Sequence, residues 1–177
     1  MQLSNTTTTY GSVSKLFHWL IFLLVLVMIA GGFFMDDVPD EYKGVIFNLH
    51  KLTGLCVLFL MILRMLWAAM NVKPSLPVAT PVWQQTATRV THYLLYLLVT
   101  AMPLVGWIGS SASRKAPHIG DITLTLPVPA DKALSHAMFD VHEVIAYMII
   151  AVFTIHVIGA LYHHYIKKDD ILRRMLP

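Results

Sequence analysis

The sequence is poor in charged residues and in cysteine. Asp, Glu, Lys and Arg make up only 13% of its 177 residues, whereas 56% are hydrophobic. Soluble domains carry roughly a quarter charged residues, so this composition excludes an ordinary soluble protein. The single cysteine, Cys56, excludes an intramolecular disulfide. The few bases form no basic face of the kind that nucleic acids require, which excludes a nucleic-acid-binding function.

The chain contains four long apolar runs, at about residues 16–35, 49–70, 92–110 and 141–165. Each run is long enough to cross a bilayer as a helix. We therefore predict an all-α fold, an integral membrane four-helix bundle that forms a single domain over residues 1–177. Lys15 precedes the first run as in a signal peptide, but the length of the run and the three later runs predict that it is retained.

The charges are divided unequally between the two ends of such a bundle. With four spans both termini share one side, which carries eight bases and two acids; the opposite side carries five bases and eight acids. Cytoplasmic segments of membrane proteins carry the excess of Lys and Arg. Both termini are therefore predicted to lie in the cytoplasm. Residues 1–10 are polar, Thr-rich and without periodicity, which predicts disorder.

The last run carries two histidines on one face. His142 and His156 are fourteen residues apart, which on an α-helix means a separation of about 21 Å along the axis and only about 40° around it. His163 continues the same stripe seven residues later. Ionisable side chains inside a membrane are costly unless they have partners, so this stripe indicates a functional site.

Histidines from other runs match these two in depth. His50 lies near the outer surface, as His142 does, and His18 lies near the cytoplasmic surface, as His156 does. Six-coordinate haem needs two imidazoles on opposite sides of one iron, supplied in a bundle by facing helices at equal depth. The sequence therefore predicts two haem b groups, with His50 and His142 as outer ligands and His18 and His156 as inner ligands. A single zinc site is excluded because its ligands must converge on one point.

Further polar residues lie near the cytoplasmic depth of the spans. Arg64 follows His50 by fourteen residues and either pairs with a haem propionate or extends to the interface. His92, His163 and His164 are open to three interpretations: spare ligands, hydrogen-bond partners of a quinone, or hydrated interfacial side chains. The sequence does not decide among these roles for His92 or His164, and it indicates none for His118 or His136.

The outer connection, residues 111–139, is the longest. The alternation at residues 122–126 predicts either a strand or an apolar lid on the membrane face. If the outer bases cluster above the outer haem, they would attract a small anion; if they are scattered, they are ordinary loop charges. The sequence alone favours scattering of the four bases concerned: Lys51, Arg114, Lys115 and Lys132.

The chain resembles the bacterial cytochrome b561 family over nearly its whole length after Tyr10. The matching motifs are Phe17-His18-Trp19-Leu20, His50 with Gly54, His142-Glu143, and the closing Leu161-Tyr162-His163-His164-Tyr165 followed by Lys168-Asp169 and Leu172-Arg173-Arg174-Met175.

This resemblance implies a di-haem protein of the bacterial inner membrane. It also implies haem b between the first and fourth helices on the inner side, and between the second and fourth on the outer side. Family members are associated with superoxide oxidation at the outer face and ubiquinone reduction at the inner face, with His163 and His92 near the quinone.

The predicted function is therefore electron transfer across the membrane from superoxide to ubiquinone. One alternative is a cytochrome b subunit that exchanges electrons between the quinone pool and a periplasmic redox protein or a membrane protein partner. Another is a transporter or proton channel without haem that uses the histidine stripe as a relay.

Overall fold

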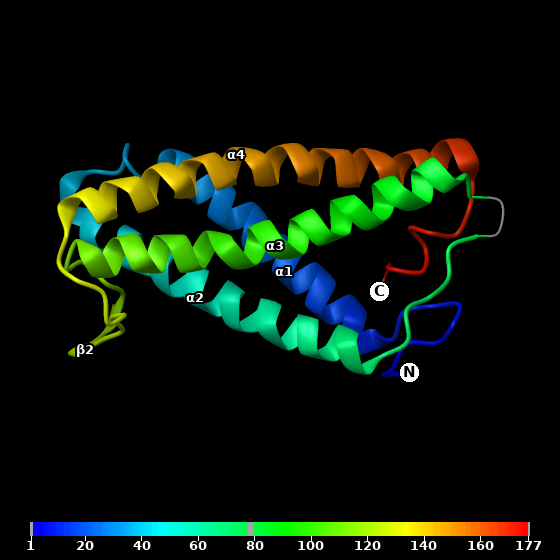
Figure 1. Ribbon diagram of the computed structural model, residues 1–177, viewed down its shortest axis with the longest axis horizontal. Coiled ribbons are helices and arrows are strands. Elements are labelled where there is room, and N and C mark those ends of the chain that lie inside the picture. Colours follow the sequence, from blue (N-terminus) through cyan, green and yellow to red (C-terminus); the bar gives the residue numbers. More distant parts are fainter. Residues whose placement is uncertain (1, 78–79, 177) are drawn as a thin grey trace.

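The computed structural model describes residues 2–77 and 80–176, which form a helical bundle (Figure 1). Its long helices are α1 (Ser12–Phe34), α2 (Asp40–Met70), α3 (Val82–Ala112) and α4 (Lys132–Tyr162), and α4 continues into a π-helical turn, η1 (His163–Lys167). All four, with η1 continuing α4, are long and apolar enough to cross a membrane. The predicted all-α membrane bundle is thus confirmed.

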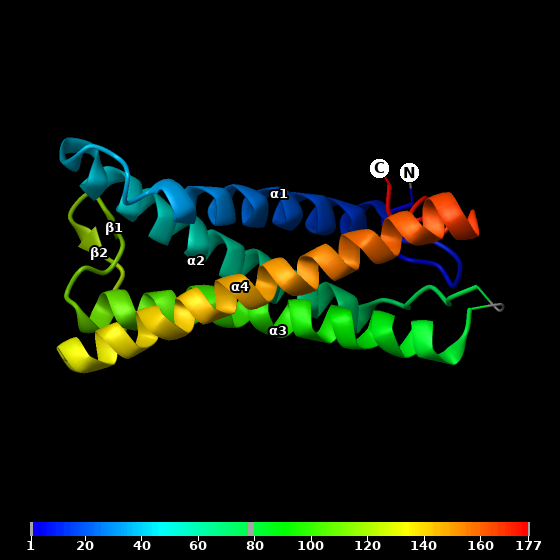
Figure 2. The same ribbon diagram turned by 90° about the horizontal axis from the view of Figure 1, so that it is seen from above.

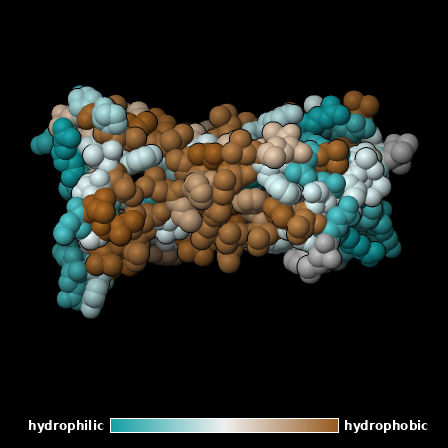
Figure 3. All heavy atoms as spheres, turned by 90° about the horizontal axis from the view of Figure 1, so that it is seen from below, coloured by the Kyte–Doolittle hydropathy of each residue, from teal (hydrophilic) through white to brown (hydrophobic). Residues whose placement is uncertain are grey.

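The helices extend beyond the predicted spans. α2 begins at Asp40 and not near residue 49, α3 begins at Val82, and α4 begins at Lys132. A helix of 31 residues, the length of α2, is about 46 Å long, whereas the hydrocarbon core is about 30 Å thick. The polar ends of the helices therefore project from the membrane, and the hydropathy of the sequence does not show where these helices begin. Figure 3 shows this as a hydrophobic belt between two hydrophilic ends.

Both termini lie at the same end of the bundle (Figure 1). This end carries the excess of bases, which marks it as cytoplasmic. The opposite, periplasmic end carries the connections from α1 to α2 and from α3 to α4.

Neighbouring helices pack in chain order, α1 on α2, α2 on α3 and α3 on α4. α4 packs closely along α3 but only loosely against α1 and α2; Figure 2 shows it crossing from the α3 side at its start towards α1 at its end. A small apolar core lies at mid-height, formed by Ile21, Val57, Met61, Leu98, Val99, Ile145 and Ile149. The loose interface of α4 with α1 and α2 is the one that both predicted histidine pairs must bridge.

The prediction of disorder for residues 1–10 is wrong for the described part of this segment. Asn5 Oδ1 accepts hydrogen bonds from Gly11 N (2.9 Å) and Ser14 Oγ (2.7 Å), and its Nδ2 donates to Val72 O (2.9 Å). A Cβ at Gly11 would lie only 2.2 Å from Leu3 O, so the chain can fold back there only on a glycine. Periodicity does not detect such a segment, because the Asn5 side chain and backbone hydrogen bonds such as Ser12 N to Gln2 O (2.9 Å) hold it, and no apolar face does.

The outer connection runs from Ser113 to Asp131 and is held against the end of α3. Strands β1 (His118–Ile119) and β2 (Ile122–Thr123) pair antiparallel, so the strand predicted over residues 122–126 is limited to two residues. Beyond it, Trp107 Nε1 donates to Leu124 O (2.7 Å). The backbone carbonyl of Leu124 therefore bonds to a side chain of α3 and does not continue the sheet.

Asp131 caps α4. Its carboxylate accepts hydrogen bonds from Ala133 N (2.8 Å) and Leu134 N (3.2 Å). We expect Asp131→Ala to destabilise the bundle by about 1 kcal/mol, measured as a lower melting temperature of the detergent-purified protein. Asp131→Asn should retain the wild-type value, as should Asp121→Ala at an exposed position of the same connection. Equal melting of Asp131→Ala and wild type would contradict the capping role.

Candidate functional site

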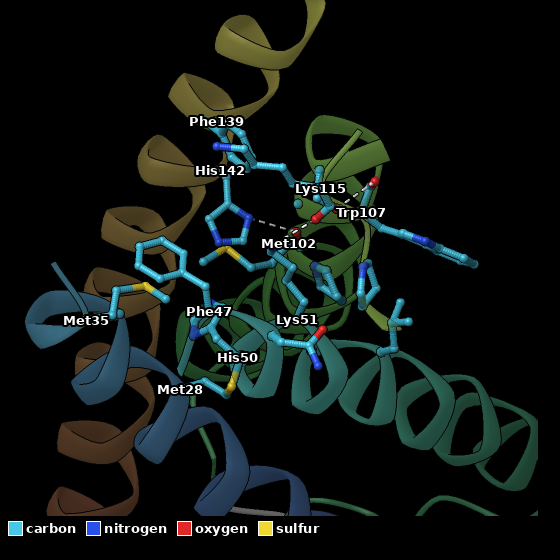
Figure 4. A pocket seen from close by; sticks show the side chains of 18 of the residues that line it. Met28, Met35, Phe47, His50, Lys51, Met102, Trp107, Lys115, Phe139 and His142 are labelled. Atoms are coloured by element: carbon cyan, nitrogen blue, oxygen red, sulfur yellow. Dashed lines mark hydrogen bonds between the residues drawn. The ribbon is translucent and has the colours of Figure 1, made fainter. Parts of the chain in front are cut away.

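The outer histidine pair joins α2 and α4. The ring centroids of His50 and His142 are 6.4 Å apart, and Figure 4 shows the two side chains approaching each other from their helices. They line a cavity of about 1510 Å³ that opens at the periplasmic end. Ordinary ligand pockets measure roughly 300–1,000 Å³, so this cavity has room for a large cofactor.

The inner histidine pair joins α1 and α4. The ring centroids of His18 and His156 are 6.2 Å apart. His92, from α3, comes still closer to His156, at 5.3 Å between centroids. Three imidazoles therefore gather near the cytoplasmic end, and His92 belongs to this group.

Both predicted pairs have a spacing that fits one iron atom between two imidazoles. With metal–nitrogen bonds of about 2.0 Å and about 1.1 Å from nitrogen to ring centre, two axial imidazoles have centroids about 6 Å apart. The observed separations of 6.4 Å and 6.2 Å agree with this value. Both pairs also bridge the loosely packed side of α4, where a flat ring can enter. The ring separations thus fit haem b at both depths, and the outer pair also lines a cavity.

A backbone carbonyl orients His142 of the outer pair. Its Nδ1 lies 3.0 Å from Met102 O on α3 (Figure 4). Because a carbonyl only accepts, Nδ1 carries the proton and the Nε2 lone pair is left free to bind a metal. Met102 cannot be predicted from the sequence, because its backbone carbonyl has this role and its side chain does not.

Arg64 lies beside His18 of the inner pair. Its Nη2 is 3.2 Å from His18 Nδ1, and its guanidinium lies over the Tyr96 ring at 5.2 Å. Arg64 therefore faces protein and does not extend to the interface. Among the residues that the structure describes, no carboxylate lies within ion-pair distance of Arg64.

His163 bonds to the C-terminal tail. Lys168 adopts a left-handed conformation (φ 54°), which turns the chain back so that Asp169 Oδ2 lies 2.5 Å from His163 Nδ1. The two side chains are only 21% and 12% exposed, respectively. His92 and His163, predicted to lie together near a quinone, thus have different partners. The family motif includes Asp169, but its contact with His163 was not predicted, because Asp169 lies outside the spans and the contact depends on this turn.

The remaining histidines divide between the two ends. His118 and His136 are exposed at the mouth of the outer cavity. His164 Nδ1 is buried near the cytoplasmic end and finds no hydrogen-bond partner within the described part of the chain.

The outer bases cluster, so the expectation that they are scattered is wrong. The side opposite the termini has five bases and eight acids in the sequence. All five bases line the outer cavity, whereas only two of the eight acids, Asp36 and Glu143, do so. The lining bases are Lys43, Lys51, Arg114, Lys115 and Lys132.

Long-range contacts of the outer connection produce this clustering. Asn48 on α2 exchanges two hydrogen bonds of 2.9 Å with the backbone of His118, and Lys51 Nζ donates to Lys115 O at 2.7 Å. The connection is thereby drawn from α3 across to α2, above His50. Charge counts along the sequence cannot reveal such a fold-back.

Comparison with known proteins identifies the family of this chain. The family model described as prokaryotic cytochrome b561 matches residues 9–177. Cytochrome b561 homolog 2 of Escherichia coli K12 is 33% identical, over 99% of this chain and 95% of the relative. The "Probable superoxide oxidase CybB" of Yersinia pestis is 31% identical, over 90% of this chain and 91% of the relative. The chain therefore belongs to the prokaryotic cytochrome b561 family, as a multi-pass protein of the bacterial inner membrane that binds haem b and transfers electrons.

Proposed function

We propose that the chain binds two haem b groups and carries electrons from superoxide at the periplasmic face to quinone at the cytoplasmic face. His50 and His142 would hold the outer haem, and His18 and His156 the inner one. The ring separations of 6.4 Å and 6.2 Å support this assignment. Haem iron, when bound, supplies a couple that accepts and releases one electron at a time.

The sorting of charges at the outer cavity is the observation that carries this proposal. Five bases and two acids line a cavity that also contains His50 and His142. One of these bases, Lys43, is paired with Asp40 at 2.8 Å, so four bases remain against two acids. A cleft lined mainly by one sign of charge concentrates small ions of the opposite sign and speeds their arrival. Superoxide is a small anion that gives up one electron and leaves as neutral dioxygen, which the bases do not retain.

The name of one relative points to the same donor. The similar protein of Yersinia pestis is named a probable superoxide oxidase. A periplasmic protein as donor would need a docking surface, whereas superoxide needs only the electropositive cavity. We therefore favour the small anion over a protein partner.

The cytoplasmic end suits a reaction that consumes protons. Reduction of a quinone to a quinol takes two electrons, from two superoxide anions, and two protons. The His163–Asp169 pair lies at this end and is partly accessible, so it can pass protons from the cytoplasm. His92, beside His156, would donate a hydrogen bond to a quinone oxygen.

The proposal is tested with detergent-purified protein in two steps. We expect oxidised and reduced spectra and haem quantification to give two b haems per chain. Superoxide should then reduce the haems, and added ubiquinone should reoxidise them with one quinol formed per two superoxide anions. Two haems that superoxide leaves oxidised would contradict superoxide as donor and favour a periplasmic redox protein.

A further inference from the structure

The two histidine pairs have polar neighbours of opposite sign. At the outer pair, the carbonyl oxygen of Met102 faces His142 Nδ1 at 3.0 Å. At the inner pair, the guanidinium of Arg64 faces His18 Nδ1 at 3.2 Å. One ligand thus has a hydrogen-bond acceptor behind it, and the other has a cation.

Gly106 makes the outer contact possible. It lies one turn after Met102 on α3, and a Cβ added there would be 3.1 Å from both Nδ1 and Cε1 of His142. That approach is closer than ordinary van der Waals contact, so a larger residue would push the ring away from Met102 O. The glycine therefore lets the imidazole reach the backbone of α3.

A carbonyl behind an axial imidazole changes the electronic properties of the ligand. The N–H that donates to the carbonyl gives the ring more imidazolate character and makes it a stronger donor to the metal. A stronger donor stabilises ferric over ferrous iron. His142 is thus arranged to lower the reduction potential at the outer site.

Arg64 has the opposite effect at the inner site. A ligand bound through Nε2 carries its proton on Nδ1, and a guanidinium, which only donates, cannot accept that proton. Arg64 therefore does not strengthen His18 as a ligand. Its positive charge, for which no described carboxylate forms an ion pair, favours the iron state of lower charge, which is ferrous.

Building on the ligand assignment proposed above, we infer that Met102 and Gly106 hold the outer haem at a lower reduction potential than the inner haem, whose potential Arg64 raises. Electrons would then move downhill from the periplasmic to the cytoplasmic end. Met102, Gly106 and Arg64 are positioning and tuning residues in this scheme.

A redox titration of the purified holoprotein, followed by optical spectroscopy, tests this inference. We expect two one-electron waves in the wild type. Gly106→Ala should move only the lower wave, and upwards, whereas Arg64→Gln should move only the higher wave, and downwards. Gly31→Ala is the matched control, since a Cβ at this outer-half position of α1 meets nothing within 4 Å; it should leave both waves unchanged. Arg64→Lys keeps the charge and should leave the higher wave close to its wild-type potential.

The outcomes separate this inference from the proposal on which it rests. If the wild type binds two haems per chain but Gly106→Ala and Arg64→Gln leave both reduction potentials unchanged, the tuning roles are contradicted and the ligand assignment is not. A shift of the higher wave by Gly106→Ala would reverse the inferred order and contradict it as well. One haem per chain in the wild type would instead overturn the ligand assignment.

Discussion

Replacement of either His50 or His142 by alanine is expected to reduce the haem content from two groups per chain to one. The two imidazoles face each other at 6.4 Å between centroids, so under the proposed assignment the loss of either would leave one iron with a single protein ligand. The double variant should lose no more haem than each single variant, because the two side chains act as one unit. Haem quantification and the reduced spectrum of the purified variants measure this.

The inner pair should behave in the same way and independently. His18→Ala and His156→Ala should each remove the other haem, and the spectrum that remains should match that of neither outer variant. His136→Ala is the matched control, because this histidine lies on α4 and lines the outer cavity but is exposed. If His142→Ala and His50→Ala removed different haems, the pairing would be wrong.

Reversal of charge at Arg114 and Lys115 should slow superoxide oxidation by roughly tenfold at low ionic strength. Both side chains are exposed at the outer cavity. Lys51 bonds to the backbone carbonyl of Lys115. Arg114→Glu with Lys115→Glu therefore reverses the charge of two side chains and leaves that contact available. The difference from wild type should fade at about 0.5 M salt, where screening acts over a few ångströms.

Stopped-flow reduction of the haems by superoxide, across a series of salt concentrations, measures this effect. Lys167→Glu with Arg173→Glu makes the same change of charge at the cytoplasmic end, and should leave the rate unaltered. A double variant at Arg114 and Lys115 that reacts as fast as wild type at every salt concentration would rule out electrostatic attraction of the donor.

The sequence predicts the bundle and the histidine pairs because both depend on local geometry. The rise and turn of an α-helix convert the interval between His142 and His156 into depth and direction, and the membrane fixes which depths are equal. The structure brings His50 to His142 and His18 to His156, as that reasoning requires. No contact between distant segments had to be known.

The sequence does not predict features that depend on contacts between segments far apart in the chain. Asn5 orders the N-terminal segment by bonding across to Val72, and the outer bases meet only because Asn48 binds the backbone of His118. The role of Met102 is carried by its backbone carbonyl, and so it has no signature in residue type.

α4 is an uninterrupted helix that contributes one histidine to each pair. One residue inserted between His142 and His156 would turn His156 by about 100° relative to its partner, and both sites could not be satisfied together. A whole inserted heptad would restore the face but shift His156 by about 10 Å along the axis. Insertions and deletions among relatives are therefore expected in the connection at residues 113–131, whereas the interval of fourteen residues within α4 should stay fixed in length.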